Sequence, residues 1–119
     1  MHRFAYLQAE TVTAAAAALA AHPEAVLKAG GVDLLDFLKE QIITPSLVVD
    51  ISHLSELRQI EMDQTTGAGR IGTLATLAQV SQHAAVQQHW PALAQAAAHA
   101  ATPQIRSLAT LGGNLCQRG

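Results

Sequence analysis

A pair of adjacent glycines, Gly30-Gly31, separates a short apolar run from a leucine-rich run, and this pattern constrains the fold more than any other feature. Residues 25–29 (AVLKA) are typical of a strand, and residues 33–40 (DLLDFLKE) place leucine and phenylalanine on one helical face. The β-branched residues 46–52 (SLVVDIS) predict a second strand. Because a helix between two strands allows parallel pairing, the sequence predicts a small parallel α/β unit here.

An alanine-rich segment, residues 13–25, precedes this pattern. It resembles the apolar core of a secretory signal, but Glu10 stands before it and alanine is a weak membrane-inserting residue. We therefore expect a helix that Thr11 or Thr13 caps and that ends near His22. Residues 4–9 before it have extended character, and no run reaches the length of a transmembrane span.

The second half of the chain has a different pattern. Residues 59–64 and 70–74 alternate in polarity on either side of the turn sequence TTGAG, which predicts an antiparallel hairpin. Residues 76–86 and 91–101 predict two helices, with Pro91 at the first helical position of the second. A second glycine pair, Gly112-Gly113, predicts another glycine turn near the end of the 119 residues.

Composition excludes several classes of function. The net charge is -2 and the seven Lys and Arg residues are scattered, so no surface for nucleic acid or anionic lipid is expected. Cys116 is the single cysteine; it cannot form an internal disulfide or hold a metal cluster by itself, and it suits a reducing, cytoplasmic compartment. We expect Cys116 to be a small buried apolar residue rather than a redox group. The six histidines include no pair at helical spacing, so no metal site is predicted.

The first glycine pair could form an anion-binding turn. Glycines between a strand and a helix permit positive φ and close approach, and the N–H groups at a helix start favour an anion such as phosphate. An ordinary strand-to-helix turn with Asp33 as its N-cap explains the same residues. A second glycine turn at Gly112-Gly113 could clasp a diphosphate from the other side, or be unrelated. Arg106 before that turn could face a phosphate or solvate a loop.

A G-x-G-x-x-G match occurs at residues 67–72, but the preceding segment is polar and no acidic strand end follows about 20 residues later. We interpret these glycines as hairpin residues rather than a dinucleotide fingerprint.

Four segments in order resemble a known family: LKAGGVDLLDFLKE, LVVDISHLSELRQIE, GRIGTLATLAQV and TPQIRSLATLGGNLCQR. Together they resemble the FAD-binding subunit of molybdenum hydroxylases, the group of xanthine dehydrogenases, carbon monoxide dehydrogenases and aldehyde oxidoreductases. The resemblance implies an α+β, PCMH-type FAD-binding fold. We expect a small parallel α/β lobe in residues 1–57 and the start of a truncated antiparallel α+β lobe in residues 58–119.

The resemblance also implies the site, the cofactor and the partners. FAD is the implied cofactor, and electrons reach it from a [2Fe–2S] small subunit that a molybdenum-cofactor large subunit reduces. An FAD-dependent oxidoreductase subunit is therefore expected; a non-catalytic interaction domain that has lost the flavin is the alternative. The implied FAD contacts are Ala29, Gly30, Gly31, Val32, Asp33 and Leu34 in the first loop, and Thr110, Leu111, Gly112, Gly113 and Asn114 in the second.

The chain departs from the family pattern in two ways. Val32 stands where Thr or another polar residue is common, and the lost hydrogen bond costs about 0.5–1.5 kcal/mol. Family subunits also continue beyond the T-L-G-G-N segment, whereas this chain ends at Gly119, so no [4Fe–4S] cluster is predicted. A truncated sheet leaves an unpaired edge and exposed apolar surface, for which we expect self-association or marginal stability.

Overall fold

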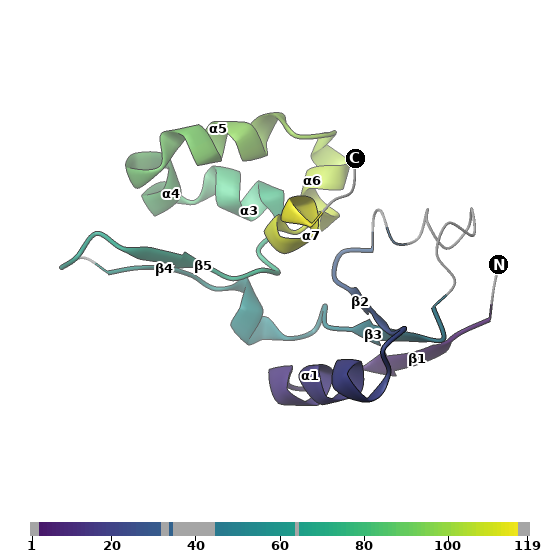
Figure 1. Ribbon diagram of the computed structural model, residues 1–119. Coiled ribbons are helices and arrows are strands. Elements are labelled where there is room, and N and C mark those ends of the chain that lie inside the picture. The colour runs from purple at the N-terminus through teal and green to yellow at the C-terminus, as the bar shows by residue number, and fades with distance from the viewer. Residues whose placement is uncertain (1–2, 32–33, 35–44, 64, 117–119) are drawn as a thin grey trace. The chain divides into compact units, whose positions relative to one another are not determined.

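The computed structural model describes residues 3–31, 34, 45–63 and 65–116. The chain divides into two compact units, Met1–Leu54 and Ser55–Gly119, whereas the sequence placed a boundary after residue 57 (Figure 1). The helix predicted for residues 33–40 lies outside the described residues except for Leu34, which is helical and half-buried.

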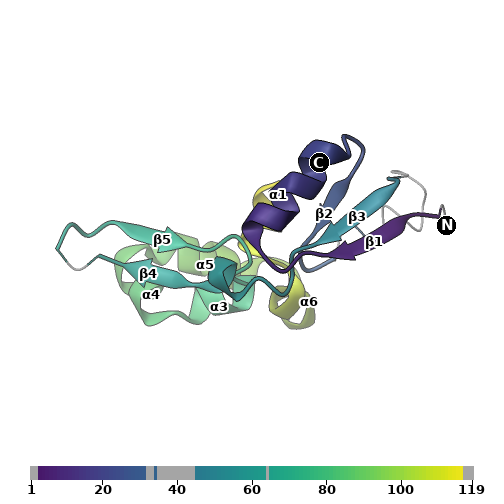
Figure 2. The same ribbon diagram turned by 90° about the horizontal axis from the view of Figure 1, so that it is seen from below.

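A three-stranded parallel sheet forms the centre of the first unit. Its strands are β1 (Ala5–Gln8), β2 (Val26–Lys28) and β3 (Leu47–Asp50), in the order β1-β3-β2 (Figure 2). All four residues of β3 are buried, as expected for a central parallel strand rich in valine. The predicted parallel pairing is confirmed, since Val26 lies opposite Val48 on β3.

Helix α1 (Val12–Ala21) lies against one face of this sheet (Figures 1 and 2). The predicted Thr11 cap is confirmed, because its Oγ1 accepts a hydrogen bond from the Ala14 N–H at 3.0 Å. The helix ends where the His22 N–H donates to the Ala18 carbonyl, also as predicted. Alanine dominates the helix, and the buried residue on it is Ala15.

The second unit begins with a 3₁₀ turn, η1 (Ser55–Arg58), and the antiparallel hairpin of β4 (Ile60–Met62) and β5 (Gly69–Ile71). This hairpin confirms the interpretation of the 67–72 glycines. Between its strands, Asp63 Oδ1 accepts from the Thr65 N–H at 2.8 Å, which closes the turn. Ile60 and Ile71, opposite each other in the register, pack against the helical core of the unit.

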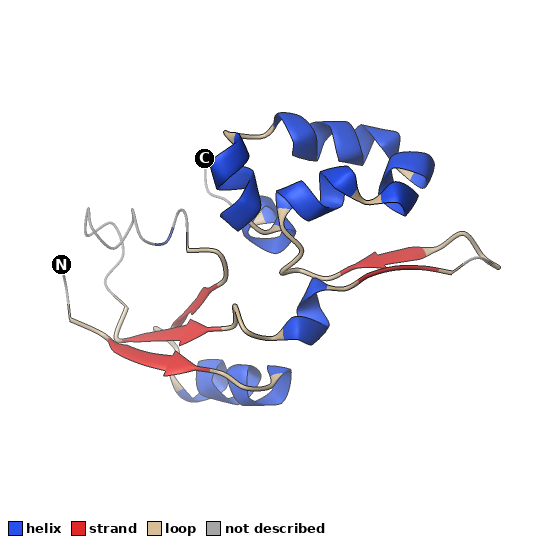
Figure 3. Cartoon of the chain, turned by 180° about the vertical axis from the view of Figure 1, so that it is seen from behind, coloured by secondary structure: helices blue, strands red, loops and turns tan. Residues whose placement is uncertain are grey.

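In the described part of this unit, five α-helices lie beside the hairpin (Figure 3). They are α3 (Leu77–Gln82), α4 (Ala84–His89), α5 (Pro91–His99), α6 (Pro103–Leu108) and α7 (Leu111–Leu115). The prediction of one helix over residues 76–86 was wrong, because His83 adopts an extended conformation (ψ 125°) that ends α3 and starts α4. The N-terminus of α3 is capped, since Thr76 and Gln79 form a reciprocal capping box.

The core of the second unit is built mostly from the small and β-branched residues of these helices. Its buried members are Ala75, Leu77, Val80, Val86, Ala94 and Ala97. Pro91 stands at the first position of α5, as predicted, with Trp90 packed against the core before it. Among the described residues, no helix has the length and apolarity needed to cross a membrane.

Candidate functional site

The first glycine turn leaves the sheet at the carboxyl end of β2. Ala29 and Gly30 are half-buried, and Gly31 is buried with φ 84°. This left-handed backbone costs a residue with a side chain roughly 1–2 kcal/mol, so the conformation itself favours glycine at position 31. Ligands of α/β sheets bind outside the carboxyl ends of the strands, which is the edge where this turn lies. Val32 and Asp33 fall outside the described residues.

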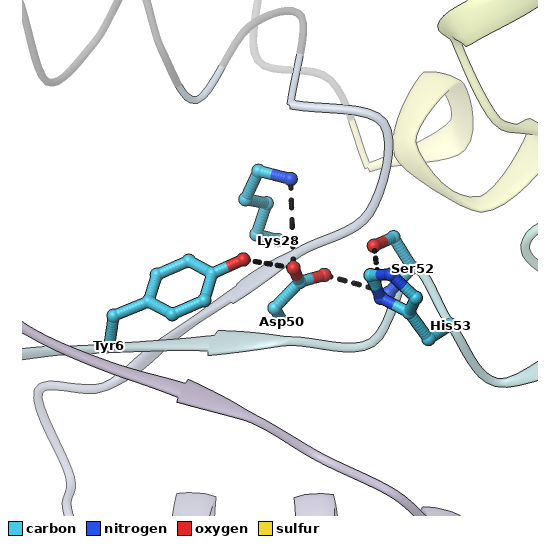
Figure 4. A network of polar contacts seen from close by, with 5 residues as sticks. All are labelled: Tyr6, Lys28, Asp50, Ser52 and His53. Atoms are coloured by element: carbon cyan, nitrogen blue, oxygen red, sulfur yellow. Dashed lines mark hydrogen bonds and ion pairs between the residues drawn. The ribbon is translucent and has the colours of Figure 1, made fainter.

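A polar cluster occupies the same edge of the sheet (Figure 4). Asp50, the last residue of the central strand, is only 2% exposed, and one of its carboxylate oxygens, Oδ2, accepts a hydrogen bond from the Tyr6 hydroxyl. Its Oδ1 accepts from the Ser52 N–H at 2.8 Å. Lys28, the last residue of β2, has its Nζ 3.9 Å from Asp50 Oδ2.

The contacts in this cluster lower the pKa of one member and raise the pKa of another. Burial opposes ionisation of Asp50, but hydrogen bonds from Ser52 and Tyr6, together with the Lys28 charge, outweigh it and lower the pKa of Asp50. The same hydrogen bond to Asp50, helped by desolvation, raises the pKa of the Tyr6 hydroxyl. Asp50 is therefore an anion at neutral pH, held at the sheet edge beside the glycine turn.

The second glycine pair does not form a turn, which corrects the prediction. Gly112 and Gly113 lie inside the short helix α7, whose N-cap is the buried Thr110. Four backbone N–H groups of this segment donate within the chain: Leu111 to Ala75 O, Gly112 to Thr73 O, Gly113 to Thr110 Oγ1 and Asn114 to Thr110 O. They are not free donors for a phosphate.

The two glycines of α7 differ in how much room their surroundings leave for a side chain. A Cβ on Gly112 would lie 1.7 Å from Thr73 Oγ1 and 3.0 Å from the Thr73 carbonyl oxygen, so packing of the chain against itself excludes a side chain there. A Cβ on Gly113 would meet only Thr110 Oγ1, at 3.0 Å, and Gly113 is exposed. The protein interior therefore explains Gly112 and leaves Gly113 available to an outside group.

These observations test whether the predicted residues suit a dinucleotide diphosphate. The first turn suits it, because a positive-φ glycine at a carboxyl sheet edge presents bare backbone. In the second segment the exposed faces of Gly113 and Asn114 are open to a ligand, while Thr110, Leu111 and Gly112 support the helix. The backbone of the first turn thus suits a phosphate, and the second segment, described by itself, offers exposed surface rather than unpaired N–H groups.

Two other residues singled out from the sequence are Arg106 and Cys116. Arg106 donates from its Nη1 to the carbonyls of Ala100 and Ala101, at 3.1 and 2.9 Å. It thereby holds Ala101, which has an unusual φ of 54°. The prediction that Cys116 is buried was wrong, because this residue at the end of α7 is exposed.

The second unit also holds a hollow with a mainly apolar lining. An open hollow of about 670 Å³ lies between β5 and the α4–α5 junction, and its lining around Trp90 is mainly apolar. Gly69 is needed beneath it, since a Cβ there would lie 1.8 Å from Trp90 Cη2. No group of three or more His, Cys, Asp or Glu residues that could hold a metal ion occurs in the described ranges.

A family model described as the FAD binding domain in molybdopterin dehydrogenase matches residues 2–119 of the chain. The chain belongs to this family. The resemblance noted from the four sequence segments is thereby confirmed over nearly the whole length.

Curated and solved relatives agree with this assignment. The xanthine dehydrogenase FAD-binding subunit of Escherichia coli O157:H7 is 42% identical over 111 residues, covering 93% of this chain and 38% of that protein. The nicotinate dehydrogenase FAD-subunit of Eubacterium barkeri is 40% identical over 93 residues, covering 78% of this chain and 30% of that protein. The crystal structure of quinoline 2-oxidoreductase from Pseudomonas putida 86 superimposes with a TM-score of 0.89 at 31% identity, over 95% of this chain and 39% of that chain.

The solved relatives also confirm the predicted α+β class of this FAD-binding domain family. The chain spans less than two fifths of the length of the xanthine dehydrogenase subunit that it matches. Sequence reasoning missed the Tyr6–Lys28–Asp50 cluster at the edge of this family domain. The pattern that could have revealed it is the parallel register, which places Gln8, Lys28 and Asp50 side by side at the three strand ends.

Proposed function

We propose that this chain forms part of the FAD-binding, electron-transfer subunit of a molybdenum-containing dehydrogenase or hydroxylase. The observation that carries the proposal is the glycine turn at the carboxyl end of β2, where Gly31 has φ 84° in a domain whose family binds FAD. When bound, the flavin supplies the redox chemistry by accepting electrons and releasing them to an acceptor. The chain's own residues bind and orient it.

The eleven residues named from the resemblance are the proposed contacts. In the first loop, the bare backbone of Ala29, Gly30 and Gly31 lets a diphosphate approach closely. In the second, Gly113 lies exposed on α7, and the internal bonds of Gly112 keep that surface in place without the cofactor.

The proposed partners are a [2Fe–2S] small subunit, which delivers electrons, and a molybdenum-cofactor large subunit, which reacts with the substrate. Support comes from relatives named as one chain of a larger enzyme, such as the caffeine dehydrogenase subunit beta of Pseudomonas sp. and the carbon monoxide dehydrogenase medium chain of Hydrogenophaga pseudoflava. Because relatives of this domain are named for xanthine, nicotinate, caffeine and carbon monoxide, the domain does not determine the substrate.

Cofactor binding is tested by purifying the chain, recording its visible spectrum and titrating it with FAD in a calorimeter. We expect flavin absorption bands or saturable binding of one FAD per chain. A folded, colourless protein that gives no saturable heat contradicts the proposal and supports the non-catalytic interaction domain instead.

Substitutions at the glycines test the site itself. Gly30→Val fills the space that the phosphate needs and should abolish FAD binding. Gly67→Asn is the matched control, because Gly67 lies in the hairpin turn with nothing within 4 Å and asparagine tolerates its φ of 75°. FAD affinity equal to that of the parent in Gly30→Val would show that the site assignment is wrong.

A further inference from the structure

In the cluster at the carboxyl edge of the first sheet, Lys28 lies near Asp50 but too far away to donate a hydrogen bond to it. The Asp50 carboxylate accepts hydrogen bonds from Tyr6 at one oxygen and from the Ser52 N–H at the other. Lys28 Nζ lies 3.9 Å from the oxygen that Tyr6 contacts, which is beyond hydrogen-bonding distance. Asp50 therefore keeps a donor on each oxygen without Lys28.

Burial distinguishes the two charged side chains. The side chain of Asp50 is 3% exposed, whereas that of Lys28 is 24% exposed. Figure 4 shows Tyr6 and Lys28 approaching Asp50 from different strands, with the lysine nitrogen turned toward the carboxylate. A lysine ammonium is a compact charge on a flexible stem with three donors, so it can change partners at little cost.

Position connects this lysine to the glycine turn. Lys28 is the last residue of β2 and directly precedes Ala29, and its carbonyl accepts from the Ile51 N–H at 3.0 Å. The strand end is thus fixed to the central strand, while the side chain remains partly exposed at the edge where the turn begins. No other lysine or arginine in the described part of the first unit stands at a strand end on this edge.

We propose that Lys28 is a cofactor-binding residue whose ammonium pairs with the diphosphate of FAD at the glycine turn, while Tyr6 keeps Asp50 hydrogen-bonded as the lysine turns outward. The inference rests on the proposed function and adds to it a charged contact from the strand itself. Tyr6 is a positioning residue here, because it acts through Asp50 and not on the ligand. Without its hydroxyl, Asp50 would hold the lysine more tightly.

The strength of such a contact sets the expected effect. A charge-assisted hydrogen bond to phosphate forms at about 2.8 Å and is roughly twice as strong as a neutral one. Its loss should weaken FAD binding by about tenfold to hundredfold. The contact should also make FAD affinity fall with rising salt, because ionic pairing at a partly exposed site is screened.

The first experiment compares the parent with Lys28→Met and Lys28→Arg by calorimetric FAD titration at low and high salt. Lys28→Met should bind FAD about tenfold to hundredfold more weakly than the parent, and its affinity should depend less on salt. Lys28→Arg should keep most of the parent's affinity and most of its salt dependence. Melting temperatures without FAD report any loss of folding. If Lys28→Met folds and binds FAD with the affinity and salt dependence of the parent, Lys28 does not contact the cofactor.

A double-mutant cycle tests the role of Tyr6. Tyr6→Phe should weaken FAD binding severalfold when Lys28 is present, and should have no further effect in the Lys28→Met background. A purely structural role predicts the same loss in both backgrounds, and that result would overturn the positioning part of the inference.

Failure of the inference and failure of the proposed function are separable. If the parent itself does not bind FAD, the proposed function fails and the inference falls with it. If the parent binds FAD and Gly30→Val does not, while Lys28→Met equals the parent, the function stands and only the role of Lys28 is refuted.

Discussion

Replacing Gly112 with alanine should destabilise the second unit whether or not a cofactor is present. The added Cβ would lie 1.7 Å from Thr73 Oγ1 and 3.0 Å from both the Cβ and the carbonyl oxygen of Thr73. The helix cannot shift freely, because the Gly112 N–H donates to that same carbonyl at 2.9 Å. Overpacking of this kind costs about 1–3 kcal/mol, from which alanine recovers up to about 1 kcal/mol of helix propensity.

We therefore expect the free energy of unfolding to fall by about 1–2 kcal/mol in Gly112→Ala. For a unit of this size the melting temperature should fall by about 4–15 °C. Thermal unfolding of the chain without FAD, followed by circular dichroism, measures the change.

Two variants show whether the clash with Thr73 is the cause. Thr73→Ala removes the nearest atom, so Gly112→Ala should cost clearly less in the Thr73→Ala background than in the parent. Gly113→Ala is the matched control on the same helix, and its melting temperature should lie close to that of the parent. An unchanged melting temperature in Gly112→Ala, or no relief from Thr73→Ala, would refute the packing argument.

Three further predictions concern stability. Gly72→Ala places a Cβ 2.0 Å from the backbone oxygen of Leu57, which cannot rotate away, so urea denaturation should show a loss of about 3 kcal/mol; a loss below that of Gly112→Ala would contradict this. Ala101→Gly relieves the φ of 54° and should gain up to about 1 kcal/mol, whereas a lower urea midpoint would show that this backbone is not strained. Because the pKa of Asp50 is lowered on folding, its stabilisation is present above about pH 3.9 and is lost as pH falls through the folded-state value. Melting temperatures between pH 5 and pH 2 should therefore fall less steeply in Asp50→Asn than in the parent, and parallel curves would contradict the shift.

Sequence patterns predicted the elements whose periodicity is strong. The valine-rich residues of β3 and the apolar run of β2 form parallel strands, and the polar alternation around the TTGAG turn forms the hairpin. Thr11 and Pro91 start their helices as predicted, because a cap or a fixed φ acts locally.

Features that depend on distant residues could not be predicted in this way. The sequence LGGNL has poor helix propensity, and α7 forms because Leu111 and Gly112 donate to the carbonyls of Ala75 and Thr73, far away in the chain. The break at His83 and the carbonyl contacts of Arg106 likewise depend on packing and loop geometry. The Asp50 cluster requires the strand register, which no single segment contains.

The strand order β1-β3-β2 has a consequence for how the first unit folds. The first two strands to be synthesised pair with the third and not with each other. No native strand pairing in this sheet can therefore form until residues 47–50 have left the ribosome, and until then the backbone groups of both earlier strands have no strand partner. Emergence of the valine-rich strand allows both ladders to form, so nascent chains whose Leu47 is still inside the ribosome should be captured by chaperones, and chains whose Leu54 has emerged should be released.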